Sequence, residues 1–291
     1  MIDFHVHIGR LSRARRCQTY DLSPPQLVER MDREGIEMSV LLPLESPEAI
    51  GGYFLTEEAI AARDLYPERL IAFVGLDPRS RNTADQIDMF VEDYGCRGFG
   101  ELKNALAFDD PRHEVIYERC NEHSLPIVFH SDPGLCYDEV GLPALERMLS
   151  KYPNATFCGH GPGFWAALSA DDDRSGGYPK GPITPTGAVD RLLGEHENLY
   201  AIFDAGSGFN AMTRDPEFTR GFIERHHHKL LFGTDYLRAN LTWSGGASVV
   251  AHDAVVEGTV ERCVLWAGSR VEAHEHLIDT IRGDDRTVMV R

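Results

Sequence analysis

Short apolar runs alternate with longer amphipathic segments over the first 235 residues. The runs are bounded by Gly or Pro and are typical of buried strands. They predict eight strands, at 1–7, 38–43, 70–76, 96–103, 126–130, 155–160, 199–205 and 229–235. Helical periodicity and helix-start signals between them predict helices at 23–35, 56–67, 83–95, 110–124, 142–153, 186–198 and 215–229.

This alternation predicts an α/β protein with parallel strands, because parallel neighbours need a crossover connection. A closed (β/α)₈ barrel (a TIM barrel) fits the count of eight strands, and a doubly wound open sheet is the competing architecture. No linker or repeat divides residues 1–235, so we expect a single domain over 1–291.

Two segments interrupt the alternation. Residues 169–187 form a polar insertion rich in Gly and Pro after the sixth strand, and we expect it to be a lid, with a solvated surface loop as the alternative. The tail, 236–291, is atypical and lacks a clear closing helix, although 271–282 has some helical spacing.

Composition narrows the function classes. With 29 basic and 46 acidic residues, the formal net charge is −17, which disfavours a nucleic-acid partner. No run approaches the roughly 20 apolar residues that span a bilayer, and the start of the chain has no signal-peptide pattern. Six single cysteines without a C-x-x-C pair indicate reduced thiols and a cytoplasmic protein.

The first strand carries two histidines. Side chains alternate between the faces of a strand, so Asp3, His5 and His7 should point one way and the apolar residues between them the other. Neutral imidazole is the commonest metal ligand, so the pair suggests a metal site. Two ordinary hydrogen-bonded histidines are the alternative.

Other strand ends carry similar side chains. In a barrel the carboxyl ends of all strands meet at one rim, where barrel enzymes have their active sites. Five strands bring metal-binding residue types, or a neighbouring lysine, to this rim: His5 and His7, Glu101 and Lys103, His130, His160, and Asp235. This convergence favours metal binding over five unrelated structural roles.

The remaining histidines fit a site less well. Successive residues on a helix point about 100° apart, so His226, His227 and His228 are expected to be a solvated helix end. His113, His123, His196 and the tail histidines are interpreted as surface residues.

These features resemble the amidohydrolase superfamily, and within it the amidohydrolase-related group that includes decarboxylases, hydratases and lactonases. The resemblance depends on DFHVHIG, GFGELK, IVFHSD, CGHGPG and LLFGTDY, and it spans residues 1–236. The tail departs from it, because the Asn-Ala motif usual near the end of relatives is absent from 236–291.

The resemblance implies one or two divalent ions, most simply zinc, with manganese, iron or nickel as alternatives. His5, His7 and Asp235 would hold one ion, and His130 would complete that site or hold a second ion with His160. Glu101 is favoured as the bridge between two ions, and a carboxylated Lys103 is the alternative. Single-ion members lack the bridge and use the histidine that matches His160 for catalysis.

A divalent ion lowers the pKa of bound water from about 15.7 to about 7, which favours a hydrolase acting on an amide, a lactone or another carboxylic ester of a small molecule. Asp235 and His160 are the expected catalytic residues. The candidate substrate contacts are Lys103, Asp132, Trp165, Tyr178 and Arg238. Asp132 is equally a candidate for orienting His130.

Two other functions stay open. The first is a single-metal non-oxidative decarboxylase or hydratase of a small aromatic or dicarboxylic acid, and the second is a metal-binding protein without turnover. A serine hydrolase is disfavoured because no G-x-S-x-G motif occurs. No membrane partner is expected, and homo-oligomerisation is left open.

Overall fold

Eight parallel strands form the centre of the molecule, as the sequence predicts. The computed structural model describes residues 2–10, 21–49, 53–236, 249–250, 255–257, 259–261, 264–265, 269–278, 280–282 and 287–289. The strands are β1 (Ile2–Val6), β4 (Met38–Leu41), β7 (Leu70–Ala72), β8 (Phe99–Leu102), β10 (Pro126–His130), β12 (Thr156–His160), β13 (Leu199–Phe203) and β14 (Leu230–Phe232).

The strands close into a barrel through two seams. Parallel pairing gives the orders β1-β4-β7 and β14-β13-β12-β10-β8. Val74 bridges to Phe99 at one seam, and Val6 bridges to Tyr236 at the other. At the second seam the Asp235 amide donates to the His5 carbonyl and the His7 amide to the Tyr236 carbonyl, both at 2.9 Å. The closed barrel is therefore confirmed over the open sheet.

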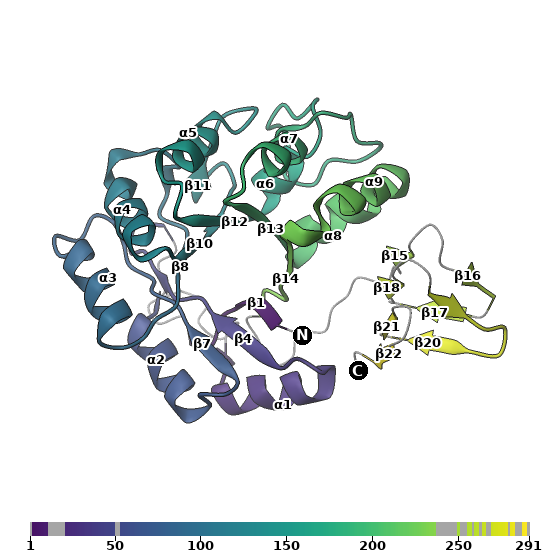
Figure 1. The fold of residues 1–291 in the computed structure, drawn as a ribbon, viewed down its shortest axis with the longest axis horizontal. Helices are drawn as coiled ribbons and strands as arrows, with labels where there is room; N and C mark the ends of the chain where they lie inside the picture. The colour runs from purple at the N-terminus through teal and green to yellow at the C-terminus, as the bar shows by residue number, and fades with distance from the viewer. Residues whose placement is uncertain are drawn as a thin grey trace.

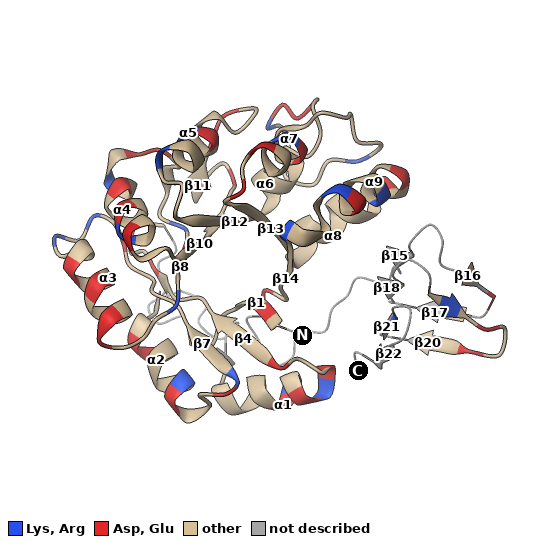
Figure 2. Cartoon of the chain, in the orientation of Figure 1, with Lys and Arg blue, Asp and Glu red and all other residues tan. Residues whose placement is uncertain are grey.

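Helices surround the barrel (Figure 1). The seven predicted helices are α1 (Pro24–Glu34), α2 (Thr56–Leu65), α3 (Thr83–Glu92), α4 (Glu114–His123), α5 (Pro143–Lys151), α7 (Ala188–Glu195) and α9 (Pro216–His226). Two further helices, α6 (Pro162–Ala166) and α8 (Ala205–Thr213), follow β12 and β13 directly. Charged residues are concentrated on the helices rather than on the barrel strands (Figure 2).

Local signals explain why α1 begins and ends where it does. The Ser23 hydroxyl accepts from the Gln26 amide, and the Gln26 side chain accepts from the Ser23 amide at 3.0 Å, which is a capping box. Gly35 ends the helix with a φ of 70°, a left-handed conformation that favours glycine. No described helix is long and apolar enough to span a bilayer.

Short strands and turns occupy the connections. They are β2 (Gly9–Arg10), β3 (Asp21–Leu22), β5 (Leu44–Glu45), β6 (Tyr53–Phe54), β9 (Leu106–Ala107), β11 (Cys136–Tyr137), and the 3₁₀ helices η2 (Pro111–His113) and η3 (His227–Lys229). Most of them follow the carboxyl ends of barrel strands, so they surround the rim at which barrel enzymes place their chemistry.

The barrel interior provides an apolar floor for the rim. Its buried side chains are Val40, Leu42, Phe73, Val128, Cys158 and Ile202. Three of these, Val128, Cys158 and Ile202, lie two residues before His130, His160 and Asp204. Strand alternation therefore brings these three polar residues to the inward face, one level above the floor.

The first strand departs from simple alternation. Its register with β4 shifts between Asp3 and Val6, and Phe4 packs against the interior cluster. The Asp3 carboxylate accepts from the Thr234 hydroxyl at 2.6 Å and from the Thr234 amide at 2.9 Å. Asp3 is thus bound to the last strand connection instead of lying beside the rings of His5 and His7.

The insertion at 169–187 contains turns, with no helix or strand assigned in this described segment. It is held on the barrel by hydrogen bonds. The Arg174 guanidinium donates to the Gly163 carbonyl at 2.6 Å, and the Ile183 amide donates to the Asp215 carboxylate at 2.9 Å. The insertion is therefore anchored to α6 and to the start of α9, and its role as a lid stays a prediction.

The tail contains strands, so the helical spacing noted over 271–282 is misleading. Its strands are β15 (Val249–Val250), β16 (Val255–Val256), β17 (Thr259–Glu261), β18 (Val264–Leu265), β19 (Arg270–Val271), β20 (His276–Ile278), β21 (Thr280–Arg282) and β22 (Thr287–Met289). β-branched residues recur in them and favour strands. Leu265, Val271 and Leu277 pack together in a small cluster separate from the barrel core.

Candidate metal centre

Six predicted ligands from five strands meet at the rim. His5 and His7 come from β1 and the residue after it, Glu101 from β8, His130 from β10, His160 from β12, and Asp235 from the connection after β14. Two sets have ligand atoms that all lie within 4.8 Å of one another, namely His5, His7 and Asp235, and His5, Glu101 and His160. The convergence expected at a barrel rim is therefore present in the structure.

The first set faces inward at the β1–β14 seam. The Nε2 atoms of His5 and His7 lie 3.0 Å apart, and Asp235 Oδ1 lies 3.6 Å from the first and 3.5 Å from the second. The His7 ring donates from Nδ1 to the Leu42 carbonyl at 2.7 Å, which leaves its Nε2 lone pair facing the set. This is the tautomer that a metal ligand requires.

Glu101 lies between the two halves of the site. Its Oε2 is 3.3 Å from His7 Nε2 and 3.8 Å from His5 Nε2. Its Oε1 is 2.5 Å from His160 Nε2 and 3.2 Å from His130 Nδ1. Each carboxylate oxygen thus faces a different pair of histidines, which is the arrangement of a bridging ligand.

Two glycines allow this close approach. Gly100 has a φ of +128°, and a Cβ there would lie 2.3 Å from the Val128 carbonyl oxygen. Gly161 has a φ of +94°, and a Cβ there would lie 2.9 Å from His130 Nδ1. A side chain at either position would displace β10 or the His130 ring, so glycine is needed beside both Glu101 and His160.

Lys103 points back to Glu101, with its Nζ 2.7 Å from the carboxylate. Burial raises the pKa of Glu101, but the charges of Lys103 and His160 outweigh it and hold that pKa well below its usual range. Burial lowers the pKa of Lys103, and the charges of Glu101 and Asp235 more than offset this, so its pKa is raised. Glu101 is therefore a carboxylate at neutral pH and Lys103 an ammonium.

Burial and charge act oppositely on the two histidines of β1. Burial lowers the pKa of His5, but the charges of Asp235 and Asp204 overcome it and raise that pKa well above its ordinary value. The pKa of His7 is lowered, chiefly by burial. The acidic groups thus act most strongly on His5, the ring closest to Asp204.

Asp204 is the residue that sequence reasoning missed. It follows β13, is 1% exposed, and accepts from His5 Nδ1 through Oδ2 at 2.6 Å. Its Oδ1 lies 3.3 Å from His160 Nδ1. The predicted strand over 199–205 contains Asp204 at its carboxyl end, so the signal used for the other site residues was present here too.

The donor set fits divalent metal ions. Imidazole nitrogens and carboxylate oxygens are the ligands that zinc and similar ions accept. His130 Nδ1 is buried without a hydrogen-bond partner, while its Nε2 bonds to Asp132 Oδ2 at 2.9 Å. A buried lone pair that the protein leaves unsatisfied is costly unless a ligand uses it, so this ring has a nitrogen available to a metal ion.

The predicted substrate contacts are dispersed. Lys103 and Asp132 lie at the site, bound to Glu101 and His130. Trp165 is 1% exposed and stacks on Phe203 with ring centroids 5.3 Å apart, so it belongs to the core, which does not support a substrate contact. Tyr178 is 51% exposed in the insertion. Arg238 lies outside the described residues.

Two histidines interpreted as surface residues are buried. His226 is 5% exposed and bonds to Asp190 at 2.7 Å, whereas His227 and His228 are exposed as expected. His113, the last residue of η2, is fully buried, with Nδ1 donating to the Ala107 carbonyl at 3.1 Å. Helix packing buries both rings because each lies on the inner face of its segment, which the sequence pattern alone did not indicate.

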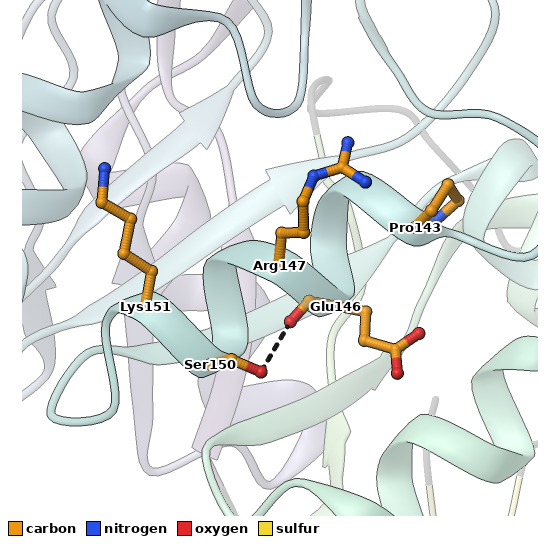
Figure 3. Close-up of a pocket in the computed structure, with 5 residues that line it drawn as sticks. All are labelled: Pro143, Glu146, Arg147, Ser150 and Lys151. Carbon is orange, nitrogen blue, oxygen red and sulfur yellow. Dashed lines mark hydrogen bonds between the residues drawn. The ribbon is translucent and has the colours of Figure 1, made fainter.

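A second region offers ligand-type atoms on the outer surface. Glu146, Glu195 and His196 lie near one another, but Arg191 pairs with both carboxylates, at 2.7 Å and 2.6 Å. A neighbouring depression on α5 is lined by Pro143, Glu146, Arg147, Ser150 and Lys151 (Figure 3). This face shares no residue with the rim, and its charges are already paired.

Comparison with known proteins decides the family. The amidohydrolase family model matches residues 2–255, which is most of the chain and includes the whole barrel. The chain belongs to the amidohydrolase family. This amidohydrolase therefore comes from a family of enzymes that act on small molecules and generally bind a divalent metal. Comparison with curated proteins gives no match.

Solved structures share the fold of this amidohydrolase. An uncharacterized TIM-barrel protein from Bordetella bronchiseptica has a TM-score of 0.54 at 17% identity, over 80% of this chain and 85% of that one. A probable 2-pyrone-4,6-dicarboxylic acid hydrolase from Acinetobacter baumannii, with citric acid bound, has a TM-score of 0.53 at 14% identity, over 80% and 83%. The 5-carboxyvanillate decarboxylase LigW from Sphingomonas paucimobilis has a TM-score of 0.51 at 13% identity, over 81% and 88%.

Proposed function

We propose that this amidohydrolase is a metal-dependent hydrolase that cleaves an amide, lactone or other carboxylic ester bond of a small molecule. The observation that carries the proposal is the position of Glu101, whose two oxygens face different histidine pairs. Two adjoining ion positions follow from it, one with His5, His7 and Asp235 and the other with His130 and His160. Zinc is the ion we propose, because four imidazoles and two carboxylates suit it.

A bound divalent ion would polarise the scissile carbonyl and lower the pKa of water. Asp235 is suited to the proton transfers. Its side chain is 21% exposed, whereas those of His5 and Glu101 are fully buried, so it reaches the open side of the site. We assign to Asp235 the acceptance of a proton from the attacking water and its delivery to the leaving group.

The other residues hold this arrangement. Lys103 is 17% exposed and cationic, so it is available to an anionic group of the substrate while it balances Glu101. Asp132 orients His130 through Nε2. The four described free cysteines, Cys96, Cys120, Cys136 and Cys158, are buried and suit a reducing compartment, which supports the proposed cytoplasmic location.

A second candidate is a single-metal decarboxylase, and the Lys103 contact favours it. An ammonium 2.7 Å from Glu101 neutralises the carboxylate that would bridge two ions. In that case one ion would be held by His5, His7 and Asp235, and His160 would contact the substrate. The fold similarity to a 5-carboxyvanillate decarboxylase is compatible with this chemistry.

Metal stoichiometry and product analysis separate these candidates. Protein purified without added metal is analysed for its elements and assayed on panels of lactones, esters, amides and aromatic acids. Two ions per chain with hydrolysis that is lost in Glu101→Gln support the hydrolase. One ion per chain together with release of carbon dioxide would overturn the hydrolase and support the decarboxylase. Bound metal without turnover would indicate a metal-binding protein. Glu146→Gln, a surface carboxylate paired with Arg191, is the control.

A further inference from the structure

Asp204 occupies a helix-capping position without capping the helix. It is the N-cap residue of α8, with extended φ and ψ of −148° and 176°, and its side chain makes no capping hydrogen bond. Aspartate is among the residues most favoured at the N-cap, where its side chain normally accepts from a backbone amide of the first turn. The Asp204 carboxylate is instead turned into the barrel, so its position forgoes a local stabilisation.

The carboxylate faces two rings from different strands. Oδ2 is 2.6 Å from His5 Nδ1, and Oδ1 is 3.3 Å from His160 Nδ1. Neither Oδ1 nor His160 Nδ1 has another hydrogen-bond partner, so the two atoms are placed to satisfy each other. The two rings contact each other edge to face, with centroids 4.4 Å apart and planes at 86°.

The opposite nitrogens of these rings face Glu101. His5 Nε2 is 3.8 Å and His160 Nε2 is 2.5 Å from its carboxylate. An ionised carboxylate only accepts hydrogen bonds, so a ring nitrogen held against Asp204 must carry a proton. Nε2 of each ring is therefore the nitrogen turned towards the proposed ion position, where an ion would take the place of the proton through which His160 Nε2 bonds to Glu101.

The other two histidines are oriented separately. His7 donates from Nδ1 to the Leu42 carbonyl, and His130 is held through Nε2 by Asp132. Asp204 instead faces the Nδ1 atoms of the remaining two rings, His5 and His160, at once. It also joins β1 to β12, which are not neighbours in the barrel.

We propose that Asp204 is a positioning residue that holds a proton on Nδ1 of both His5 and His160 and so presents both Nε2 atoms to the metal site. This rests on the proposed metal-dependent function. Loss of an outer carboxylate that orients a metal-binding histidine typically costs 10- to 100-fold in metal affinity. Because Asp204 serves two rings, the upper part of that range, about 100-fold, is expected.

Asp204→Asn gives a sharp test because its amide has one acceptor and one donor. The oxygen can keep one Nδ1 proton, but the NH₂ group requires a bare nitrogen opposite it. Since His5 makes the shorter contact with Asp204, His160 is expected to lose its Nδ1 proton. Asp190→Asn is the matched control, because Asp190 makes the same kind of bond to His226 at 2.7 Å outside the site.

The measurement is a ¹H–¹⁵N spectrum of the full-length protein labelled on histidine, recorded with and without zinc, with signals assigned through His5→Gln and His160→Gln. Zinc affinity is measured alongside by competition with a chromophoric chelator. We expect slowly exchanging Nδ1 protons on both rings in the wild type, loss of at least one in Asp204→Asn, and partial recovery in Asp204→Glu. Unchanged ring signals in Asp204→Asn, or an equal loss of affinity in Asp190→Asn, would overturn the proposal.

The ring signals need neither bound metal nor turnover. If Asp204→Asn does not fold, the ring protons and zinc affinity of Asp204→Glu decide, since its shifted carboxylate must alter them if Asp204 acts as proposed. A wild type with both Nδ1 protons but no bound zinc would contradict the proposed function and leave the orientation by Asp204 supported.

Discussion

The rim of the barrel buries charged and polar side chains, whereas its flank, the layer between strands and helices, buries aromatic ones. At the rim, His5, Glu101, His160 and Asp204 are all at most 4% exposed, so charged and polar groups are buried together. On the flank, aromatic side chains such as Phe157 and Trp165 fill the space between strands and helices. Burying charge costs free energy unless each group is paired, whereas burying aromatic surface supplies it. The flank therefore stabilises a rim that is organised for binding.

This contrast predicts that the rim and the flank respond differently to substitution. Changes at the rim should alter metal binding and turnover with little effect on unfolding. Changes on the flank should alter the free energy of unfolding and leave substrate affinity intact.

The largest effect is expected at the open side of the rim, in Asp235→Asn. Loss of the proposed proton acceptor should reduce kcat by about 10³-fold, which corresponds to roughly 4 kcal/mol. Steady-state kinetics with the substrate found in the panels measures it, and thermal unfolding should shift little. Asp88→Asn, which removes a carboxylate bound to His123 on the outer surface, is the control. Retention of full kcat in Asp235→Asn would remove this residue from the mechanism.

On the flank, Trp165→Ala should lower the free energy of unfolding by about 3–4 kcal/mol, because it empties a buried site stacked on Phe203. KM should stay unchanged, since the ring is 1% exposed. Denaturant unfolding and kinetics measure the two quantities. Tyr178→Ala, at a 51% exposed position in the insertion, should change stability by less than about 0.5 kcal/mol. A raised KM in Trp165→Ala with normal stability would place the ring at the substrate instead.

The next largest effect is a pH dependence of the free energy of unfolding, which we expect from a buried histidine on the flank. Burial lowers the pKa of His113 from its ordinary 6.5 to about 4, and its Nε2 is buried without a hydrogen-bond partner. Below pH 6.5 the unfolded chain takes up a proton here, whereas the folded protein does not until about pH 4. The stabilisation is therefore complete above pH 6.5 and is lost as the pH falls towards 4, by about 3 kcal/mol.

The test compares urea unfolding of the wild type and His113→Gln at several pH values across this window. The difference in slope between the two proteins isolates His113 from the other titrating groups. His227→Gln, at an exposed position in η3, should reproduce the wild-type slope. Equal slopes for the wild type and His113→Gln would show that this ring does not contribute.

The smallest effect is expected at a helix end. Ser23→Ala removes the hydroxyl that caps α1 and should cost about 1 kcal/mol in unfolding free energy. Ser150→Ala is the matched control, because that hydroxyl donates to the Glu146 carbonyl at 3.0 Å within α5 and caps nothing. It should be neutral or slightly stabilising. A loss of metal affinity in Ser23→Ala would contradict the separation of rim and flank.

Strand periodicity and strand ends predicted the barrel and the six residues at its rim, because those features are local in the sequence. Asp204 was missed because it stood inside an apolar run and was treated as part of the strand. The burial of His113 and His226 depends on which face of a segment packs inward. The tail was misread over 271–282 because its short parallel strands, such as β19 and β21, pair with other strands of the tail, and two or three residues are too few to show a strand period.

The seam between β1 and β14 joins the first and the last strands of the barrel to be synthesised. Thr234, whose hydroxyl bonds to Asp3, follows it by 231 residues, and Asp235 comes next. The histidines of the first strand are synthesised early. Their carboxylate partner is synthesised only when nearly the entire barrel has been made. A nascent chain therefore cannot complete the His5, His7 and Asp235 group before its eighth strand emerges, so the proposed metal site forms only when synthesis of the barrel is almost finished.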